Sequence, residues 1–158
     1  MNCAPQTLVI GIGNPLRSDD GVGRVVVRRL QELNLPDVST CEETGEGAAL
    51  IEAWKHAENV VVIDAVQSGA ASPGTIHRFD ASCAPVPARF FHCSTHAFSI
   101  AEAVELARAL DQLPSRLVLY GIEGGNFNAG ENLSPEVAAA ANELPGCIRR
   151  EIEARSVC

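Results

Sequence analysis

Three side chains suited to metal binding or acid–base chemistry follow or precede segments with clear secondary-structure patterns. Asp20 follows the first apolar run of the chain, Asp64 ends the apolar run Asn59–Asp64, and His96 precedes a helical segment. A carboxylate at the end of an apolar strand is costly to desolvate unless a metal ion, a cation or backbone donors accompany it. Two carboxylates and one imidazole form an O,O,N ligand set, which suits a borderline divalent ion with open positions for water or substrate. The set has none of the thiolates that close a structural zinc site.

Each candidate also has an ordinary structural interpretation. An aspartate at a strand end commonly caps the following turn, and this is the alternative for Asp64. Asp20 would complement the dipole of a helix that starts there. His92 and Cys93 lie close to His96 in the sequence and compete with it as metal ligands. The three residues therefore form a site only if the fold brings their segments to one edge.

Alternating strand and helix patterns predict how these segments are arranged. Short apolar runs indicate strands, and apolar positions that repeat roughly every three to four residues indicate helices. We expect strands at 7–12, 38–42, 59–64, 75–79 and 116–121, and helices at 20–33, 47–55, 97–110 and 134–155. This order predicts a single α/β domain over residues 1–158, with helices on both faces of a mostly parallel sheet. In such a sheet ligands bind at the carboxyl ends of the strands, where the candidate residues fall.

The composition disfavours several classes of partner. Hydrophobic residues make up 46% of the 158 residues and charged residues 20%, an ordinary balance for one globular domain. With 12 Lys and Arg against 20 Asp and Glu, the net charge of −8 disfavours broad contact with nucleic-acid phosphates or anionic lipid. The aromatic content of 4% is low for base stacking. We therefore expect neither a nucleic acid nor a membrane as partner.

The sequence also predicts where the protein works. No run reaches the roughly 20 apolar residues of a membrane span, and Met1–Gln6 has no basic region of a signal peptide. The six cysteines include no CxxC pair and are expected to be reduced thiols. These features predict a cytoplasmic protein, and they leave its oligomeric state open.

The glycine-rich turn after the first strand is also compatible with dinucleotide binding. However, Leu16 stands where the G-x-G-x-x-G fingerprint that starts at Gly11 needs its third glycine. Asp19 and Asp20 place negative charge where a pyrophosphate needs hydrogen-bond donors. We therefore do not expect a nucleotide site at this turn.

The candidate residues lie within longer motifs that follow one another along the chain. These are Gly11-Ile-Gly-Asn-Pro-Leu-Arg-Ser-Asp-Asp-Gly-Val-Gly23, Val61-Val-Ile-Asp-Ala65, Ser94-Thr-His-Ala-Phe98, and Tyr120-Gly-Ile-Glu-Gly124 with Leu133-Ser-Pro-Glu136. Together they resemble the motifs of the hydrogenase maturation endopeptidases, over roughly residues 7–155. Members of that family remove a C-terminal extension from the large subunit of nickel–iron hydrogenases after nickel insertion.

The resemblance implies a three-layer α/β/α sandwich with a twisted five-stranded sheet and a cleft that senses nickel. The metal-binding and catalytic residues of the family fall on Asp20, Asp64 and His96, and the family is classed with the aspartic peptidases. The implied partner is a nickel–iron hydrogenase large-subunit precursor, which would supply the nickel. Where the family has an acid after its second strand, this chain has Glu42.

Two other functions remain as alternatives. The peptidyl-tRNA hydrolases also open with a strand and a Gly-x-Gly-Asn-Pro turn, but they resemble this chain only up to Pro15. Their RNA substrate fits poorly with a net charge of −8. A non-catalytic nickel-binding maturation chaperone would need the same ligands as a protease, so the sequence does not separate these two functions.

Overall fold

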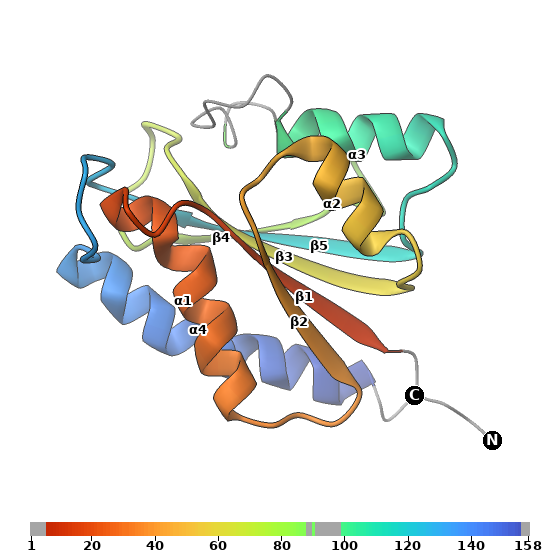
Figure 1. The fold of residues 1–158 in the computed structure, drawn as a ribbon, viewed down its shortest axis with the longest axis horizontal. Helices are drawn as coiled ribbons and strands as arrows, with labels where there is room; N and C mark the ends of the chain where they lie inside the picture. Colours follow the sequence, from red (N-terminus) through yellow and green to blue (C-terminus); the bar gives the residue numbers. More distant parts are fainter. Residues whose placement is uncertain (1–5, 88–89, 91–98, 156–158) are drawn as a thin grey trace.

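A computed structural model describes residues 6–87, 90 and 99–155, which form one five-stranded sheet between layers of helices (Figure 1). The strands are β1 (Thr7–Ile12), β2 (Val38–Glu43), β3 (Asn59–Val66), β4 (Ile76–Asp80) and β5 (Arg116–Glu123). Their order across the sheet is β2-β1-β3-β5-β4, with β4 antiparallel to β5 at one edge and all other pairs parallel. The predicted three-layer, mostly parallel α/β fold is confirmed.

The helices of the described segments cover both faces of the sheet. They are η1 (Ser18–Gly21, a short 3-10 helix), α1 (Val22–Glu32), α2 (Gly47–Trp54), α3 (Ile100–Ala109) and α4 (Pro135–Arg155). One face is covered by α1 and α4, and the other by α2 and α3 (Figure 1). None of these described helices is long and apolar enough to span a lipid bilayer.

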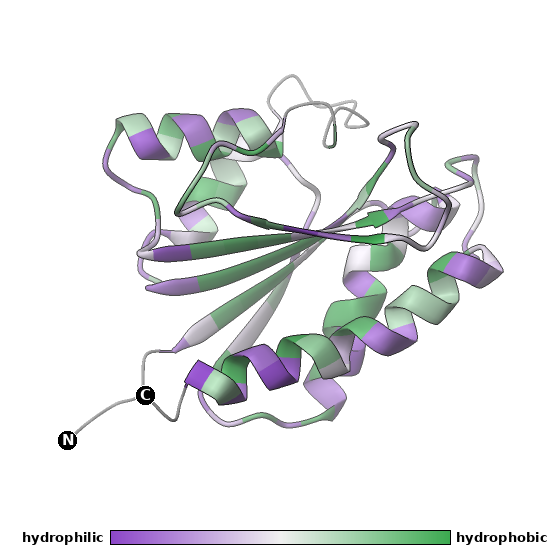
Figure 2. Ribbon diagram, turned by 180° about the vertical axis from the view of Figure 1, so that it is seen from behind, coloured by the Kyte–Doolittle hydropathy of each residue, from purple (hydrophilic) through white to green (hydrophobic). Residues whose placement is uncertain are grey.

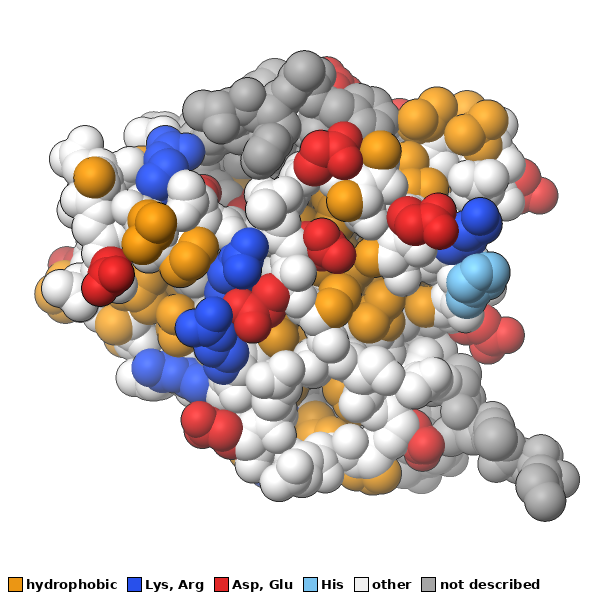
Figure 3. Space-filling model, viewed as in Figure 1, with side chains coloured by type: hydrophobic (Ala, Val, Ile, Leu, Met, Phe, Trp, Pro, Cys, Tyr) orange, Lys and Arg blue, Asp and Glu red, His pale blue; other side chains and the backbone are white. Residues whose placement is uncertain are grey.

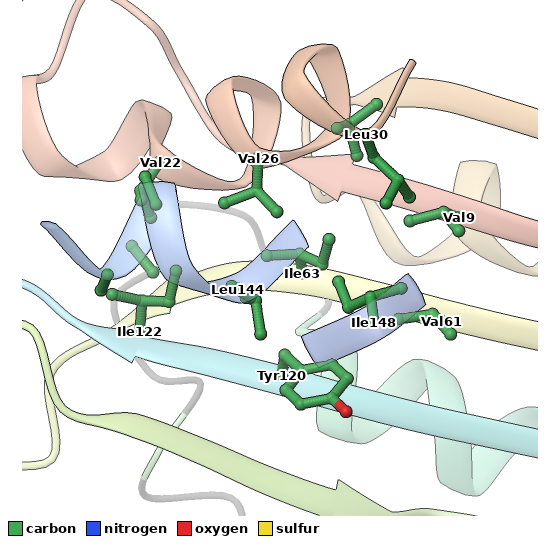
Figure 4. Packing of buried hydrophobic residues seen from close by; sticks show 14 of the residues in the cluster. Val9, Val22, Val26, Leu30, Val61, Ile63, Tyr120, Ile122, Leu144 and Ile148 are labelled. Atoms are coloured by element: carbon green, nitrogen blue, oxygen red, sulfur yellow. The ribbon is translucent and has the colours of Figure 1, made fainter. Parts of the chain in front are cut away.

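Hydrophobic side chains on the two faces of the central strands form two cores. On one face Val9, Ile63 and Tyr120 pack with Val26 of α1 and Leu144 of α4 (Figure 4). On the other face the same strands pack against α2 and α3. The central strands are therefore apolar along most of their length, as the hydropathy colours of Figure 2 show. Burial of this apolar surface is the main favourable contribution to folding.

β3 and β5 each extend two residues further than the sequence pattern predicted. β3 continues two residues past Asp64 because it stays paired with β5 up to Val66 and Glu123. Asp64 thus lies within the strand, in register with Gly121 of β5, and not at the strand end. The backbone around its carboxylate is therefore held by sheet pairing.

The third helix starts later than predicted. α3 begins at Ile100, and its N-cap is Ser99. The Ser99 hydroxyl oxygen accepts a hydrogen bond from the Glu102 N–H, and the Glu102 carboxylate accepts one from the Ser99 N–H. This reciprocal pair satisfies two backbone donors at the helix start, which explains why the helix begins here and not at residue 97.

Two glycines allow α1 to start directly against the sheet. A Cβ atom on Gly11 would lie 2.4 Å from the carbonyl oxygen of Gly23. A Cβ atom on Gly23 would lie 2.3 Å from the carbonyl oxygen of Ile63 and 2.5 Å from that of Ile12. Such distances are shorter than hard-sphere contact, so only glycine fits at either position. The start of α1 consequently touches the end of β1 and the middle of β3, and this contact fixes the position of η1.

We expect Gly23→Ala to lower the free energy of unfolding by about 3 kcal/mol or more, because its methyl group would overlap backbone oxygen atoms. Gly146→Ala in α4 is the matched control, since a Cβ there would meet only Arg150 Nη1, at 3.7 Å. This control should gain about 0.5–1 kcal/mol from the higher helix propensity of alanine. Urea unfolding of both variants measures the difference. Equal stabilities would contradict the close contact at Gly23.

Candidate functional site

The turn before η1 places Asp20 at the carboxyl edge of the sheet. The chain reverses at Gly13, which has a φ of +140° and a backbone so close to η1 that a Cβ atom would lie 1.8 Å from the Asp20 carbonyl oxygen. The Asn14 N–H donates a hydrogen bond of 3.0 Å to Asp20 Oδ2. The Asp20 residue is partly exposed. Its carboxylate is therefore oriented by the turn while keeping access to solvent.

Asp64 comes from the neighbouring strand β3. Its Oδ1 accepts a hydrogen bond of 2.8 Å from the Ala65 N–H, and its partner in register on β5 is Gly121, which has no side chain. The residue keeps some surface exposure, but the protein encloses its carboxyl group closely. Burial raises the pKa of Asp64 well above its usual range, the nearby Asp20 carboxylate raises it further, and the Ala65 N–H lowers it only in part. The fold thus brings Asp20 and Asp64 close enough to repel each other.

This repulsion determines what the two carboxyl groups can do. Two carboxylates in one site do not both ionise readily, so the pair tends to retain a proton or to bind a cation. A carboxyl group that keeps its proton can act as an acid, and the same group becomes a metal ligand when a cation displaces the proton. The geometry therefore supports acid–base chemistry and binding of a divalent cation at the same place.

The third predicted ligand, His96, lies outside the described residues, as do its competitors His92 and Cys93. Within the described ranges, which omit 91–98, no three His, Cys, Asp or Glu side chains are grouped to hold a metal ion. The three-ligand site therefore stays a prediction. The described chain resumes at Ser99, and α3 starts on the side of the molecule where the strands have their carboxyl ends (Figure 1).

The neighbouring acid, Asp19, has a structural role that the sequence did not reveal. It is fully buried. Its Oδ2 accepts hydrogen bonds from the N–H groups of Gly125 and Asn126, both at 2.8 Å, and from the Ser134 hydroxyl at 2.7 Å. Its Oδ1 accepts a bond of 2.7 Å from the Ser134 N–H. Burial raises the pKa of Asp19, but these hydrogen bonds outweigh that effect and lower it. Asp19 thus connects η1 to the loop between β5 and α4.

Glu123, the last residue of β5, forms a second buried polar junction. Its side chain is 2% exposed. Its carboxylate accepts hydrogen bonds from the Ser68 N–H, at 2.8 Å, and from the Ser68 hydroxyl, while His77 Nε2 lies 3.2 Å from Oε1. The His77 side chain is only 19% exposed, and its ring contacts that of Phe90. Glu123 therefore joins the segment after β3 to β4.

Glu42 supports the turn that carries Asp20. Its Oε1 lies 2.9 Å from Arg28 Nη2 and 3.7 Å from Arg24 Nη1. The Nε–H of Arg24 in turn donates a hydrogen bond of 2.6 Å to the carbonyl oxygen of Gly13. The described ion pairs of Glu42 are therefore with arginines of α1. Basic and acidic side chains also lie beside one another elsewhere on the face that Figure 3 shows.

A sequence profile of the hydrogenase maturation protease family matches residues 25–151 of this chain. The chain belongs to the hydrogenase maturation protease family. It is 31% identical over 155 residues to a putative hydrogenase maturation protease of Methanocaldococcus jannaschii, a match that covers 92% of this chain and 96% of the relative. The expected family is therefore confirmed, and with it a hydrolase of the endopeptidase class.

Two further comparisons show the extent of the likeness. The NiFe hydrogenase maturation protease HycI of Thermococcus kodakarensis has a similar fold, with a TM-score of 0.67 and 28% identity over 91% of this chain and 90% of that one. The hydrogenase expression/formation protein HupD of Thiocapsa roseopersicina is 31% identical over 140 residues. That match covers 87% of this protease but 63% of HupD, so the chain spans less than two thirds of this relative.

For this protease we expect Asp19→Asn to lower the free energy of unfolding by about 3 kcal/mol near pH 7, because buried donors lose a charged acceptor. A lowered pKa in the folded state means that the stabilisation is present above the ordinary aspartate value of 3.8 and is lost as the pH falls through the lowered pKa. The difference in free energy of unfolding between wild type and Asp19→Asn should therefore become smaller at acid pH. Asp20→Asn is the control and should change stability by less than about 1 kcal/mol, since an amide oxygen can accept the same Asn14 N–H bond. Urea unfolding at neutral and acid pH tests this, and a pH-independent gap would contradict it.

Proposed function

We propose that this chain removes the C-terminal extension of a nickel–iron hydrogenase large-subunit precursor after nickel insertion, and that the inserted nickel is its recognition signal. The feature that carries the proposal is the close enclosure of the Asp64 carboxyl group beside Asp20, where burial first and the Asp20 charge second raise the pKa of Asp64. Family membership supports the protease activity. In this proposal the nickel arrives with the precursor and is part of the substrate.

The charge of the site supports nickel recognition. Without a cation, the two carboxyl groups favour a state in which Asp64 keeps its proton. A divalent ion supplies the missing positive charge, and Asp20, Asp64 and a neutral His96 would then offer it two oxygen ligands and one nitrogen ligand. Binding would therefore depend on a charge that only a metal-loaded precursor carries. In this way metal insertion would precede proteolysis.

The same pair supports an aspartic-type hydrolysis. A carboxyl group that holds a proton can donate it to the amine that leaves the cleaved bond, while a second carboxylate nearby can accept a proton from the attacking water. Asp64 is the group whose environment favours the proton. Nickel binding displaces that proton, so in the loaded complex we assign Asp64 the role of metal ligand and Asp20 that of the base, which takes a proton from the attacking water and passes it to the leaving amine.

The family match argues against one alternative, a peptidyl-tRNA hydrolase, and leaves the other, a nickel-binding chaperone, to experiment. The likeness to peptidyl-tRNA hydrolases ends at Pro15, whereas the family match runs from residue 25 to residue 151. The protease interpretation is therefore preferred over an RNA substrate. A nickel-binding chaperone would bind the precursor without cutting it, and the mass of the precursor after incubation separates these outcomes.

Nickel-loaded precursor should lose its extension when incubated with the wild-type chain, and nickel-free precursor should not. Asp64→Asn and Asp20→Asn keep the shape of each side chain but replace a charged ligand with a weakly coordinating amide. Both variants should reduce binding and cleavage of the loaded precursor at least tenfold, and intact-protein mass spectrometry with calorimetry measures both. Equal processing of nickel-free precursor by wild type would show that nickel is not the signal.

The same assay tests the third ligand. His96→Ala should abolish processing, and His92→Ala, a matched change four residues earlier, should have a smaller effect. If His92→Ala is inactive and His96→Ala processes normally, the imidazole ligand is His92.

We also propose that this reaction takes place in the cytoplasm. The described cysteines Cys41, Cys83 and Cys147 are free thiols, which fits a reducing compartment.

A further inference from the structure

An exposed leucine stands beside the candidate site. Leu16, in the turn between β1 and η1, is 60% exposed, the largest value among the large hydrophobic residues that are exposed in the described part of the chain. The others are Leu33, Leu106 and Leu110. Leu33 and Leu110 are the C-caps of α1 and α3, and Leu106 lies in the second half of α3; both helices end on the side of the sheet where the parallel strands begin (Figure 1). Leu16, in contrast, lies at the carboxyl ends of the strands, with Asp20 and Asp64.

The backbone around Leu16 is held firmly. The Leu16 N–H donates a hydrogen bond of 2.9 Å to Asn14 Oδ1, and the Leu16 carbonyl oxygen accepts one of 2.9 Å from the Gly130 N–H. The next residues continue this pairing, since Arg17 forms a β-bridge with Gly130 and the Ser18 N–H donates to the Gly130 carbonyl oxygen at 2.8 Å. The turn and the loop before α4 thus lie side by side at this edge (Figure 1).

The Leu16 side chain is therefore exposed to water, and the hydrogen-bonded turn has little freedom to move so as to bury it. A single exposed leucine needs no explanation by itself. Here, however, the backbone N–H and carbonyl are both paired within the protein, so the turn would lose little conformational entropy when a partner covers the side chain. The turn therefore holds Leu16 in place for an apolar contact beside the candidate site.

Leu16 also lies close enough to the candidate site for one protein partner to cover both. Asp20 is four positions along the chain from Leu16, so the two Cα atoms lie within about 14 Å of each other. The Asp20 N–H donates a hydrogen bond of 3.1 Å to the Arg17 carbonyl oxygen, which shortens the path further. A standard interface covers about 800 Å² on each partner, which is wide enough to include both residues.

We propose that Leu16 is a contact residue for the protein substrate, and that it packs against an apolar side chain of the precursor close to the bound metal. This inference rests on the proposed function and extends it to the surface that holds the precursor. A protein partner fits better than a lipid surface, because the net charge of −8 opposes binding to anionic membranes. Leu16 does not touch the reacting atoms in this proposal, so it contributes to affinity and not to the chemical step.

The test compares three variants for affinity and cleavage with the nickel-loaded precursor. Leu16→Ser should raise the Kd and the KM about tenfold, the effect of removing one buried leucine contact, and should leave kcat within about twofold. Leu16→Met keeps an apolar side chain of similar volume and should restore affinity to near the wild-type value. Leu110→Ser, at a residue that is 55% exposed on the opposite edge, is the matched control and should bind as wild type does.

Each outcome decides between the two proposals. If wild type cleaves the precursor and Leu16→Ser binds it equally well, the role of Leu16 is wrong while the proposed function stands. If wild type binds the precursor without cutting it and Leu16→Ser loses affinity, the contact stands and the protease function fails. Absence of binding by wild type overturns both, and an equal loss of affinity in Leu110→Ser overturns the specific role of Leu16.

Discussion

The whole site depends on how closely the start of α1 packs against the end of β1 and the middle of β3. Gly11 and Gly23 allow backbone to meet backbone there, at distances that exclude any side chain. Because η1 directly precedes α1, this contact determines where Asp20 lies. Asp20 then faces Asp64 closely enough for the two charges to interact. The glycines of the first motif therefore serve the site by permitting a close approach of two segments.

The adjacent residues Asp19 and Asp20 have different roles, since Asp19 supports the fold and Asp20 belongs to the candidate site. Asp19 is buried and uses both carboxylate oxygens to hold the loop between β5 and α4. Asp20 is partly exposed and accepts one hydrogen bond from the turn before it. Glu123 performs a similar supporting task after β3, where it joins Ser68 to His77. The supporting carboxylates are thus buried and satisfied by hydrogen bonds, whereas Asp20 and Asp64 raise the cost of ionising one another.

Much of this arrangement could be predicted from residue patterns. The apolar runs predicted the strands, the alternation with helices predicted a mostly parallel sheet, and the carboxyl-edge rule placed Asp20 and Asp64 together. The pattern failed where long-range pairing decides, since β3 extends past Asp64 only because β5 pairs with it. It also missed Asp19 and Glu123, whose partners lie far away in the sequence. The alternating pattern of an edge strand likewise does not reveal that His77 lies beside Glu123.

The electrostatic coupling of Asp20 and Asp64 is the central claim, and a carbon-detected NMR titration of the Asp64 carboxyl group tests it most directly. In the metal-free wild-type protein, the pKa of Asp64 should lie well above the ordinary aspartate value of 3.8. In Asp20→Asn it should fall partway back, because the repulsion is removed while the burial remains. An ordinary pKa in the wild type, or one that Asp20→Asn leaves unchanged, would contradict the coupling on which the proposed response to nickel rests.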